Sequence, residues 1–426
     1  MRIWLIHVGE PLPIDRGDAR QLRMSLLASR LTALDHEVLW WSSTFDHNHK
    51  RQRYDTDARI PVADNYALYL LKGTPYSSNV SLRRWLNHYQ LAHRFRRLAL
   101  TEPTPDVLVC TIPTLELAAA AVSFARQHSI PAILDVRDLW PDAIAEAFPK
   151  PVRSAVDLLL LPMQHWARRA IRGADALTAV SPSYLHWAVS RAGRPRSACD
   201  RVFPLAYPRS DVALQARTAA AEALRKLGVD QTKKIVWFIG IFGRSYDLST
   251  AIRAAHHLAR LGRHDLQFVF CGSGDRMERW IREAAGLETV TFTGWVDRAA
   301  ISYLMSVAWV GLAAYVPEAP QSLPNKLFEY MSAGLPVLSS LSGDAAELLA
   351  RHRCGLTYRA GDSRHLAESL LILLDDQGLR AEMARNAGSA YQQHYAAEMV
   401  YSEMANFVLE IARRSSAATA TGRRGS

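Results

Sequence analysis

One window of the chain has the residues that a short helix ending in a tight turn requires. Residues 322–336 read SLPNKLFEYMSAGLP. Pro324 suits the first turn of a helix, where its missing N–H is not needed, and Ser322 or Leu323 then precedes it as the cap. Gly334 suits the left-handed position that follows a helix end. The window therefore predicts a helix of about ten residues that leads into a strand.

One face of this helix carries polar groups that fit a phosphorylated ligand. Ser322, Lys326 and Glu329 recur at i, i+4 and i+7, and Asn325 flanks that face. Free N–H groups at a helix start, a cap hydroxyl and a cation attract phosphate, and a carboxylate two turns further on can accept the hydroxyls of a ribose. The pattern fits a nucleoside diphosphate site. It equally fits an ordinary amphipathic helix with a Lys326–Glu329 ion pair.

Two glycine turns upstream strengthen the first interpretation. Gly240-Ile-Phe-Gly243 follows an apolar run and is followed by Arg244, and Gly272-Ser-Gly274 follows the next one. Glycines let a backbone approach a pyrophosphate closely. Each turn is also common as a plain connection between a strand and a helix, so neither is specific alone.

The elements that would position these residues alternate between strands and helices. Apolar runs of strand length, separated by helical segments, predict a parallel sheet covered on both faces. The expected strands of the first series are 1–9, 36–41, 106–110 and 131–136, with helices at 18–34 and 115–128. The expected strands of the second series are 234–240, 267–271, 290–292, 310–313 and 336–339, with a helix at 247–261. Two similar series predict an α/β protein with two Rossmann-like domains joined near residues 203–210, where Pro204 and Pro208 interrupt the pattern.

Composition excludes several other classes of protein. The chain has 426 residues, of which 49% are hydrophobic and 22% charged, so it is neither wholly disordered nor fibrous. Its four cysteines are far apart and form no CxxC pair, which argues against a disulfide scaffold or a cysteine-based zinc site. The histidines have no HExxH spacing. We expect no metal and no cofactor.

The formal net charge of +10 suggests an anionic partner. Residues 81–100 carry five arginines and no acid among Trp85, Tyr89 and Phe95, and residues 158–172 are similar. Such mixtures suit anionic membrane surfaces, although a packed helix with a solvated basic face would look the same. No motif typical of nucleic-acid binding accompanies the charge.

The membrane relation expected from the sequence is peripheral. No run of about 18 apolar residues is present, and acidic residues appear early, unlike a secretory signal. We expect a cytoplasmic protein, with possible attachment to the inner face of the plasma membrane.

The motifs in this order resemble family-4 glycosyltransferases, which are retaining enzymes of the GT-B fold with two facing Rossmann-like domains. The resemblance covers nearly the whole chain. Within the family, the motifs are most similar to those of bacterial members that build lipid-linked surface polysaccharides, including N-acetylfucosamine transferases. The matching segments are Asp135-Val-Arg-Asp-Leu-Trp-Pro141, Gly173-Ala-Asp-Ala-Leu-Thr-Ala-Val-Ser181, Gly240–Gly243, Phe270-Cys-Gly-Ser-Gly274, Val290-Thr-Phe-Thr-Gly294, Ser322–Pro336 and Ser342-Gly-Asp-Ala-Ala-Glu347.

The resemblance implies a domain plan. Residues 1–205 would form an acceptor-binding domain and residues 206–390 a nucleotide-sugar-binding domain. A helix at 391–414 would pack back on the first domain, and residues 415–426 would form a disordered tail rich in small and polar residues.

The resemblance also assigns roles to residues. The family signature has two glutamates separated by seven residues; Glu329 matches the second, which holds the donor ribose, and Gln321 replaces the first. Arg244 would pair with the donor phosphate, and Lys326 would supply the charge of a lysine that the family often places where Tyr246 or Asp247 stands here. The expected catalytic residues are Asp138, Arg244 and Lys326, and the expected donor-binding residues are Gly17, Gly243, Gly274, Gln321, Ser322, Asn325 and Glu329.

Two of these assignments have plain alternatives. Asp138 resembles a position where the family often has a histidine near the donor sugar, but it could instead cap a helix or pair with Arg137. Gly17 would approach the donor phosphates from the other domain, or it could be a simple loop glycine.

The expected function is hexosyl transfer from a nucleoside diphosphate sugar, with a UDP-sugar favoured, to a lipid-linked or polysaccharide acceptor. A nucleotide-sugar 2-epimerase would need acid and base groups for which no clear set is found. A non-catalytic GT-B binding subunit remains open because Gln321 replaces a carboxylate.

Overall fold

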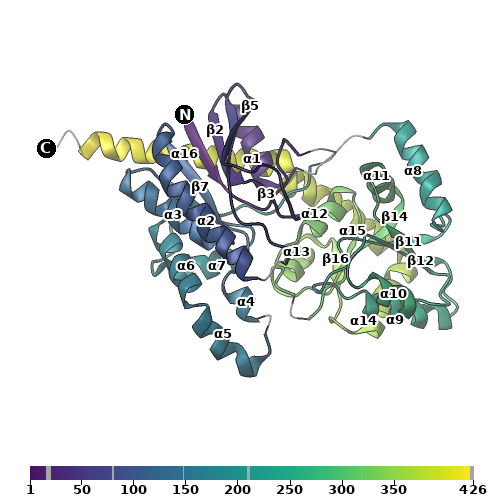
Figure 1. Ribbon diagram of the computed structural model, residues 1–426. Helices are drawn as coiled ribbons and strands as arrows, with labels where there is room; N and C mark the ends of the chain where they lie inside the picture. The colour runs from purple at the N-terminus through teal and green to yellow at the C-terminus, as the bar shows by residue number, and fades with distance from the viewer. Residues whose placement is uncertain (16–20, 79–80, 147, 209–211, 318, 423–426) are drawn as a thin grey trace. The chain divides into compact units, whose positions relative to one another are not determined.

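The computed structural model describes residues 1–15, 21–78, 81–146, 148–208, 212–317 and 319–422, and the chain folds into two compact units (Figure 1). Unit 1 comprises Met1–Pro204 and Glu398–Ser426, and unit 2 comprises Leu205–Ala397. Gly17 lies outside the described residues. The first division falls within the range 203–210, where the prolines interrupt the sequence pattern. Each unit is built on its own sheet.

Unit 1 has an eight-stranded sheet in the order β10-β9-β8-β7-β1-β2-β6-β5. All neighbouring strands are parallel except β5 and β6. The strands are β1 (Arg2–Ile6), β2 (Glu37–Ser43), β5 (Ala58–Ala63), β6 (Tyr66–Leu71), β7 (Val107–Ile112), β8 (Ala132–Val136), β9 (Ala176–Ala179) and β10 (Arg201–Val202), beside a small antiparallel pair, β3 (Phe45–Asp46) and β4 (Arg51–Gln52). Strands β7 and β8 are buried along their whole length because helices cover both faces.

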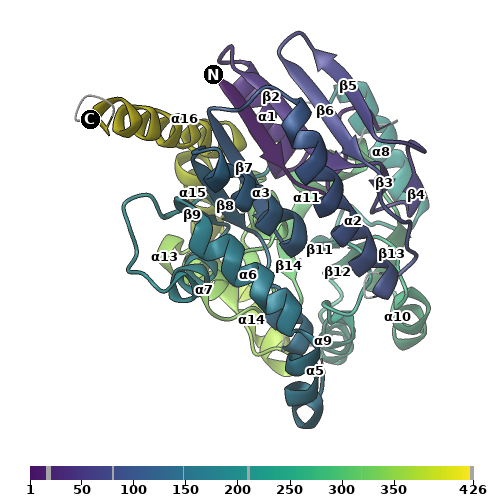
Figure 2. The ribbon, with the colours of Figure 1, turned by 60° about the vertical axis from the view of Figure 1, so that its left-hand side comes forward.

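The helices of unit 1 include three that lie side by side, α2, α3 and α6 (Figures 1 and 2). The helices are α1 (Arg23–Thr32), α2 (Leu82–Leu98), α3 (Leu115–Gln127), α4 (Asp142–Glu146), α5 (Arg153–Leu159), α6 (Leu161–Gly173), α7 (Pro182–Ala192) and α16 (Ala397–Gly422), with short 3₁₀ turns at Ala99–Thr101 and Lys150–Val152. The expected start of the first helix at residue 18 falls in the range that the structure leaves out; the described helix begins at Arg23.

Helix α16 returns the end of the chain to unit 1. Phe407 packs against Phe203 with ring centroids 5.5 Å apart, and Glu410 pairs with Arg201 at 3.3 Å. The helix runs through Gly422, so the disorder expected from Ser415 onward is replaced by helix as far as that residue. The alanines of this segment have high helix propensity, which explains why small and polar composition alone misled the prediction.

Unit 2 has a six-stranded, all-parallel sheet in the order β13-β12-β11-β14-β15-β16. The strands are β11 (Lys234–Ile239), β12 (Leu266–Cys271), β13 (Val290–Gly294), β14 (Ala308–Ala313), β15 (Val337–Ser339) and β16 (Gly355–Thr357). The helices are α8 (Leu214–Lys226), α9 (Leu248–Arg260), α10 (Met277–Glu283), α11 (Arg298–Val307), α12 (Asn325–Ser332), α13 (Asp344–His352), α14 (Ser363–Asp375) and α15 (Gln377–Ala390), followed by a π-helical turn at Tyr391–Tyr395. The expected α/β fold with two Rossmann-like domains is confirmed.

Candidate nucleotide-binding site

The strand order of unit 2 creates a switch point beside β11. This strand has β12 on one side and β14 on the other, so the loops that leave β11 and β14 run in opposite directions. In open α/β sheets, ligands bind at the carboxyl ends of the strands at such a point. Here the two loops pair with each other: Tyr246 and Tyr315 form an antiparallel bridge, and the N–H of Val316 donates to the carbonyl of Ser245 at 3.1 Å.

The two glycine turns pack backbone against backbone next to this point. The N–H of Gly240 donates to the carbonyl of Cys271 at 3.0 Å, and that of Phe242 donates to the carbonyl of Ser273 at 2.9 Å. Gly272 has φ +138°, and a Cβ there would lie 1.9 Å from the carbonyl oxygen of Gly240. Glycine is therefore required at this position by packing of the turns themselves.

Gly274 and Gly243 differ in what their surroundings demand. A Cβ on Gly274 would lie 2.7 Å from the carbonyl oxygen of Phe242, so packing already accounts for this glycine. A Cβ on Gly243 would meet its nearest atom, the carbonyl oxygen of Ile241, at 3.9 Å. Arg244, the next residue, is exposed. Donor binding by Gly243, Gly274 and Arg244 remains a prediction.

Helix α12 begins later than expected. It starts at Asn325 with Pro324 in the N-cap position, and no side chain caps it. The prediction that Ser322 or Leu323 caps the helix is wrong: Pro324 occupies the cap position, and the Ser322 hydroxyl donates a hydrogen bond to Asp344, in the first turn of α13. The extended backbone of Pro324 (ψ 152°) moves the helix start past the reach of Ser322. Gly334 ends the helix in a left-handed conformation (φ +66°), as expected.

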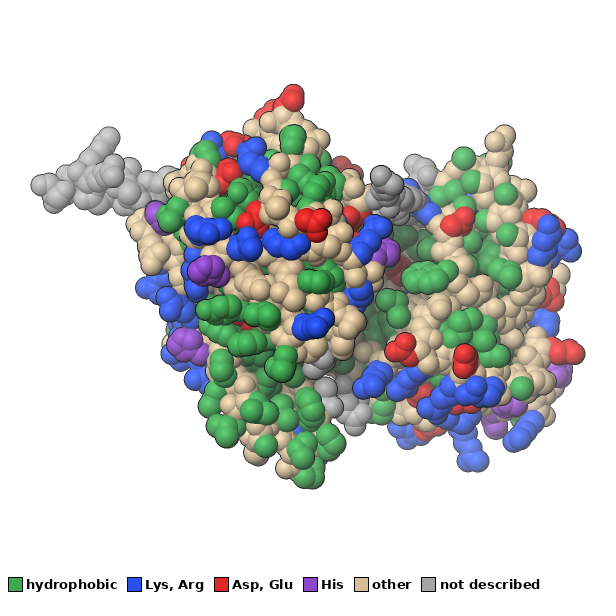
Figure 3. Space-filling view, viewed as in Figure 1, with side chains coloured by type: hydrophobic (Ala, Val, Ile, Leu, Met, Phe, Trp, Pro, Cys, Tyr) green, Lys and Arg blue, Asp and Glu red, His purple; other side chains and the backbone are tan. Residues whose placement is uncertain are grey.

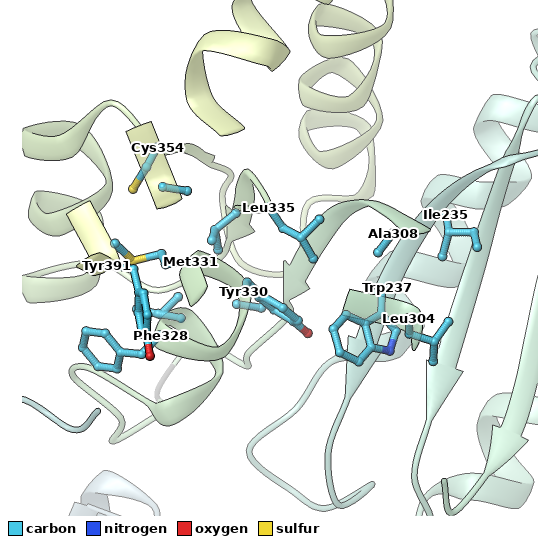
Figure 4. Packing of buried hydrophobic residues seen from close by; sticks show 14 of the residues in the cluster. Ile235, Trp237, Leu304, Ala308, Phe328, Tyr330, Met331, Leu335, Cys354 and Tyr391 are labelled. Atoms are coloured by element: carbon cyan, nitrogen blue, oxygen red, sulfur yellow. The ribbon is translucent and has the colours of Figure 1, made fainter. Parts of the chain in front are cut away.

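The packing of α12 on the sheet fixes its register (Figure 4). The Tyr330 hydroxyl donates to the carbonyl of Leu312 at 3.1 Å, and its ring meets Trp237 edge to face with centroids 5.4 Å apart. A Cβ on Gly311 would lie 2.3 Å from the Tyr330 ring, so the close contact requires glycine in β14. Leu327 and Met331 are fully buried in the same core. The face of α12 that remains carries Lys326 and Glu329.

The structure brings Lys326 to the glycine turn. Its side chain is 5% exposed, and its Nζ lies 4.1 Å from the ring centroid of Phe238 and 5.0 Å from that of Tyr246. A Cβ built on Gly240 would lie 3.0 Å from the same Nζ. Cation–π contacts help to hold an ammonium group in a setting with little water. The charge is therefore held at the carboxyl end of β11.

Glu329 lies one turn further along α12 and faces a group of tyrosines. It is 8% exposed. Burial raises the pKa of Tyr246, and the negative charge of Glu329 raises it further. Burial and neighbouring charges, including Glu329, also raise the pKa values of Tyr315 and Tyr330. These hydroxyls therefore stay protonated at neutral pH beside the carboxylate.

Gln321 reaches the switch-point loop. Its Nε2 donates to the hydroxyl of Ser245 at 3.5 Å, a long contact. Its Oε1 is buried and accepts no hydrogen bond from the described residues. An acceptor in this state costs free energy unless a ligand or water donates to it. Gln321, which replaces the first glutamate of the family signature, is therefore linked to Lys326 indirectly. It contacts Ser245, and the ring centroid of the next residue, Tyr246, lies 5.0 Å from Lys326 Nζ.

Asp138 lies in unit 1, directly after β8. Its Oδ1 accepts a hydrogen bond from the N–H of Leu139 at 2.8 Å, and burial raises its pKa. The alternative of an ion pair with Arg137 is not observed, because Arg137 pairs with Glu10 and contacts His7 Nε2 at 3.0 Å. A catalytic role for Asp138 remains a prediction.

The sequence analysis did not identify the set around His7. His7 Nδ1 lies 2.6 Å from the Thr111 hydroxyl, and burial, with the charges of Arg137 and Arg23, keeps its pKa well below the usual value. Its only sequence signal was a histidine directly after a buried strand. No group of three or more His, Cys, Asp or Glu side chains that could hold a metal ion occurs in the described part of the chain.

Comparisons with known proteins agree with the fold. The family model "Glycosyl transferases group 1" matches residues 233–376, which lie in unit 2. The chain is 28% identical over 256 residues to an alpha-D-kanosaminyltransferase of Streptomyces kanamyceticus, across 59% of this chain and 64% of that protein. The match thus spans less than two thirds of that relative's own length.

Solved structures extend the likeness to nearly the whole chain. A sucrose-phosphate synthase from Thermosynechococcus elongatus has a TM-score of 0.71 at 18% identity, covering 96% of this chain and 98% of that one. Anabaena Alr3699/HepE, solved in complex with UDP, has a TM-score of 0.64 at 15% identity, covering 96% and 100%. These values show a shared fold. The chain therefore has the GT-B fold and resembles family 4, and its residues 233–376 match the model of the glycosyl transferases group 1 family.

Proposed function

We propose that this protein is a retaining glycosyltransferase that moves a hexosyl group from a nucleoside diphosphate sugar to a lipid-linked or polysaccharide acceptor in bacterial surface glycan synthesis. The donor we favour is a UDP-sugar. The observation that carries the proposal is the position of Lys326, whose ammonium group is held beside the Gly240 turn at the switch point of unit 2.

Several features support a nucleotide donor. Two proteins of the same fold were solved with such ligands: Alr3699/HepE with UDP, and an E. coli protein described as trehalose-6-phosphate with UDP-2-fluoro glucose. In this chain, Glu329 and Asn325 would bind the ribose, and Gln321 would donate to or accept from sugar hydroxyls. The unpartnered Oε1 of Gln321 is suited to accept from a hydroxyl.

The proposed chemistry depends on charge at the leaving group. Negative charge grows on the β-phosphate as the nucleotide departs. Lys326, Arg244 and the N–H groups at the start of α12 would offset it, so we propose that no metal ion is needed. In a retaining reaction the departing phosphate can take the proton of the acceptor hydroxyl, and no protein nucleophile is required. Asp138 would act near the donor sugar, as the family resemblance implies.

A membrane-bound acceptor is supported by an exposed apolar surface on unit 1, which we call the α2–α5 patch. Figure 3 shows hydrophobic side chains gathered over α5. The α2–α5 patch consists of Leu82, Trp85, Leu86, Tyr89, Phe148, Val152, Leu158, Leu159 and Leu161. Leu82 is 85% exposed and Leu159 79%. Large exposed apolar patches mark interaction sites, and arginines on the same helices suit anionic lipid.

The attachment we propose is peripheral, on the cytoplasmic face of the plasma membrane. Within the described residues, no helix is both long enough and apolar enough to cross a bilayer. Trp85 of α2 and Trp166 of α6 pack with ring centroids 6.4 Å apart, so the two basic segments identified in the sequence lie next to each other. Tryptophan side chains next to basic residues are typical of helices that lie at the interface between lipid and water.

A thermal-shift screen with UDP, GDP, ADP and dTDP and their sugars tests the donor. A ligand at 100 times its dissociation constant should stabilise the folded protein by about 2.7 kcal/mol. Stabilisation by UDP followed by transfer to an acceptor is the expected result. Formation of an epimer without acceptor would indicate a 2-epimerase instead, and binding without transfer or hydrolysis of any donor would indicate a non-catalytic subunit. No response to any nucleotide would contradict the proposal.

A further inference from the structure

The sheet of unit 1 has a switch point of its own. Strand β2, the next strand of this sheet along the chain, lies on one side of β1, and β7 lies on the other. His7 directly follows β1, and Thr111 lies near the end of β7. His7 Nδ1 is 2.6 Å from the Thr111 hydroxyl, so this contact joins the carboxyl ends of the two strands. Ligands of open α/β sheets bind at such a point.

Arg137 reaches this switch point from the neighbouring strand, because it directly follows β8. Its Nη1 lies 3.0 Å from His7 Nε2 and forms an ion pair with Glu10. Both partners are buried, with 5% of His7 and 4% of Glu10 exposed. Burial keeps the pKa of His7 well below its usual value, and arginine can only donate, so the neutral ring accepts at Nε2 and donates from Nδ1 to Thr111. The ring and the carboxylate together fix the direction of the guanidinium.

A second arginine of unit 1 shows how a purely structural guanidinium is bound. Arg23 has a fully buried side chain, and its three nitrogens all donate: Nε and Nη2 to Asp135 at 2.8 Å, and Nη1 to the carbonyl of Phe203 at 2.9 Å. The side chain of Arg137 is 16% exposed, and its Nε and Nη2 form no hydrogen bond with the residues that the structure describes. Arg137 therefore keeps two donors on a side chain that solvent reaches.

The charges around Arg137 favour a neutral ligand. Arg137 is balanced by Glu10, and Arg23 is balanced by Asp135. The next residue, Asp138, adds a carboxyl group and no cation. An anion would therefore meet no excess of positive charge. A neutral group that carries oxygen atoms can still accept from the two remaining donors, and neighbouring hydroxyls of a sugar ring present two such oxygens side by side.

The turn that brings Glu10 to Arg137 lies at the surface. Gly9 has φ +103°, a left-handed value that favours glycine, and it turns the chain between His7 and Glu10. It is exposed, and a Cβ built on it would meet no described atom within 4 Å. The backbone beside the Arg137–Glu10 pair is thus uncovered by the described residues.

We propose that Arg137 binds neighbouring hydroxyl groups of a neutral sugar in the acceptor, and that Glu10 and His7 are positioning residues that direct its guanidinium. The inference rests on the proposed function, because it assigns a chemical group to the acceptor. These three residues belong to unit 1, and none is among the residues assigned to the donor. The switch point of unit 1 would then serve the acceptor as that of unit 2 serves the donor.

Saturation-transfer NMR on the full chain, with UDP at saturation, tests the site. The probes are the methyl glycosides of glucose, galactose, mannose and N-acetylglucosamine, with methyl glucuronide as an anionic counterpart. We expect the wild type to bind at least one neutral glycoside, and to bind it more tightly than the glucuronide. Arg137→Gln should weaken this binding about ten-fold or more, and Arg137→Lys should not restore it, because lysine lacks the planar pair of donors. Arg2→Gln is the matched control: Arg2 pairs with Glu37 at 3.0 Å, at the amino end of the same sheet.

Two further variants separate binding from folding. Arg137→Gln combined with Glu10→Gln removes both charges, so no buried carboxylate is left without its partner, and this double variant should also lose the glycoside. Glu10→Gln alone leaves the charge of Arg137 unbalanced, so the preferred probe should change from the glycoside to the glucuronide while UDP affinity stays the same. A purely structural role of Glu10 would lower both affinities together, and an unchanged preference would contradict its positioning role.

The proposal is overturned if the wild type binds none of the neutral glycosides, or if it prefers the glucuronide. It is also overturned if Gln321→Ala weakens glycoside binding and the Arg137 variants do not, since the sugar then lies beside the donor. UDP binding without glycoside binding would remove this inference and leave the proposed function in place. Glycoside binding that depends on Arg137, in a protein that binds no nucleotide, would support the site and contradict the proposed function.

Discussion

Lys326 makes a cation–π contact with Phe238, with its Nζ 4.1 Å from the ring centroid. The contact joins α12 to β11, two elements that lie far apart in the chain, at the carboxyl end of the sheet. The ring restricts the ammonium group to the neighbourhood of Gly240, where a phosphate would approach the turn. A charge held in place before the reaction costs no reorganisation when the leaving group departs.

Replacing Lys326 should therefore affect turnover more than nucleotide affinity. We expect Lys326→Ala to lower the transfer rate at saturating donor by about 10²–10³, by analogy with the loss of one oxyanion donor. Lys326→Arg should recover part of that rate, and Lys226→Ala, an exposed lysine in α8, should have no effect. Steady-state kinetics and UDP calorimetry on the same variants separate the two effects. An unchanged rate in Lys326→Ala would place the donor phosphate elsewhere.

Arg244 should act on the same phosphate. Arg244→Ala should also slow transfer, and the double variant with Lys326→Ala should lose less than the product of the two single effects. The measurement is a double-mutant cycle on the transfer rate. Fully multiplicative effects would show that the two cations serve different groups.

Glu329→Ala should weaken UDP binding by about 1.5–3 kcal/mol, the range for hydrogen bonds to a charged group. The reason is its proposed contact with the ribose hydroxyls. Glu347→Ala removes an exposed carboxylate from α13 and is the control. Calorimetry measures both affinities, and thermal melting checks that the variants fold. Equal UDP affinity in the two variants would rule out the ribose role.

Gly272→Ala should destabilise unit 2 because its Cβ would lie 1.9 Å from the carbonyl oxygen of Gly240. Overpacking of this kind costs about 1–3 kcal/mol, and backbone cannot yield as a flexible side chain can. Gly286→Ala is the control: that residue also has positive φ (+82°), but its Cβ would meet nothing within 4 Å. Urea unfolding compares the two midpoints. A loss no larger than that of Gly286→Ala would mean that the turns separate easily.

Asp135 should make unit 1 sensitive to acid. It forms two hydrogen bonds with the guanidinium of the fully buried Arg23, both at 2.8 Å, and accepts a third from Thr178 at 2.7 Å. Burial alone would raise its pKa, but Arg23 and these hydrogen bonds lower it. The folded pKa is below the unfolded value of about 3.9, so the stabilisation is complete above that pH and is lost as the pH falls through the folded pKa.

Asp135→Asn tests this ion pair. It should cost about 3–5 kcal/mol at neutral pH, because Arg23 remains buried without its counter-charge, and it should flatten the pH dependence of unfolding below pH 4. Asp64→Asn, at an exposed position, is the control. Urea unfolding between pH 3 and pH 7 measures both effects. An equal acid response in the wild type and Asp135→Asn would contradict the assignment.

The sequence was most informative where chemistry and local pattern coincide. Apolar runs located β1, β7, β8 and β11 because these strands are buried on both faces. Strand β5 (Ala58–Ala63) was missed because it is a largely exposed edge strand that contains Pro61. Gly334 was correctly placed because a left-handed residue after a helix has a strong preference for glycine.

Contacts between distant residues were beyond prediction. The cap at Ser322 failed because its partner, Asp344, lies 22 residues further along the chain. The rings that hold Lys326 come from β11 and its following loop, and the ring of Tyr76 is met by Lys50 and Arg84 from two other segments of unit 1. No local pattern signals such meetings, since they depend on strand order and on how each helix packs against the sheet.

The α2–α5 patch should insert into anionic membranes. Leu158 and Leu159 are 67% and 79% exposed, and full burial of a leucine side chain contributes about 1.5–3 kcal/mol. Replacing both by glutamine should therefore reduce flotation on phosphatidylglycerol vesicles about ten-fold or more. Leu214→Gln is the matched control, because Leu214 is 78% exposed but lies on α8 of unit 2.

Binding should weaken at high salt, since Arg83 and Arg153 add an electrostatic part that ions screen. Equal flotation of the double variant and Leu214→Gln would show that the patch does not meet lipid, and flotation that is equal on neutral and anionic vesicles would remove the role of the arginines.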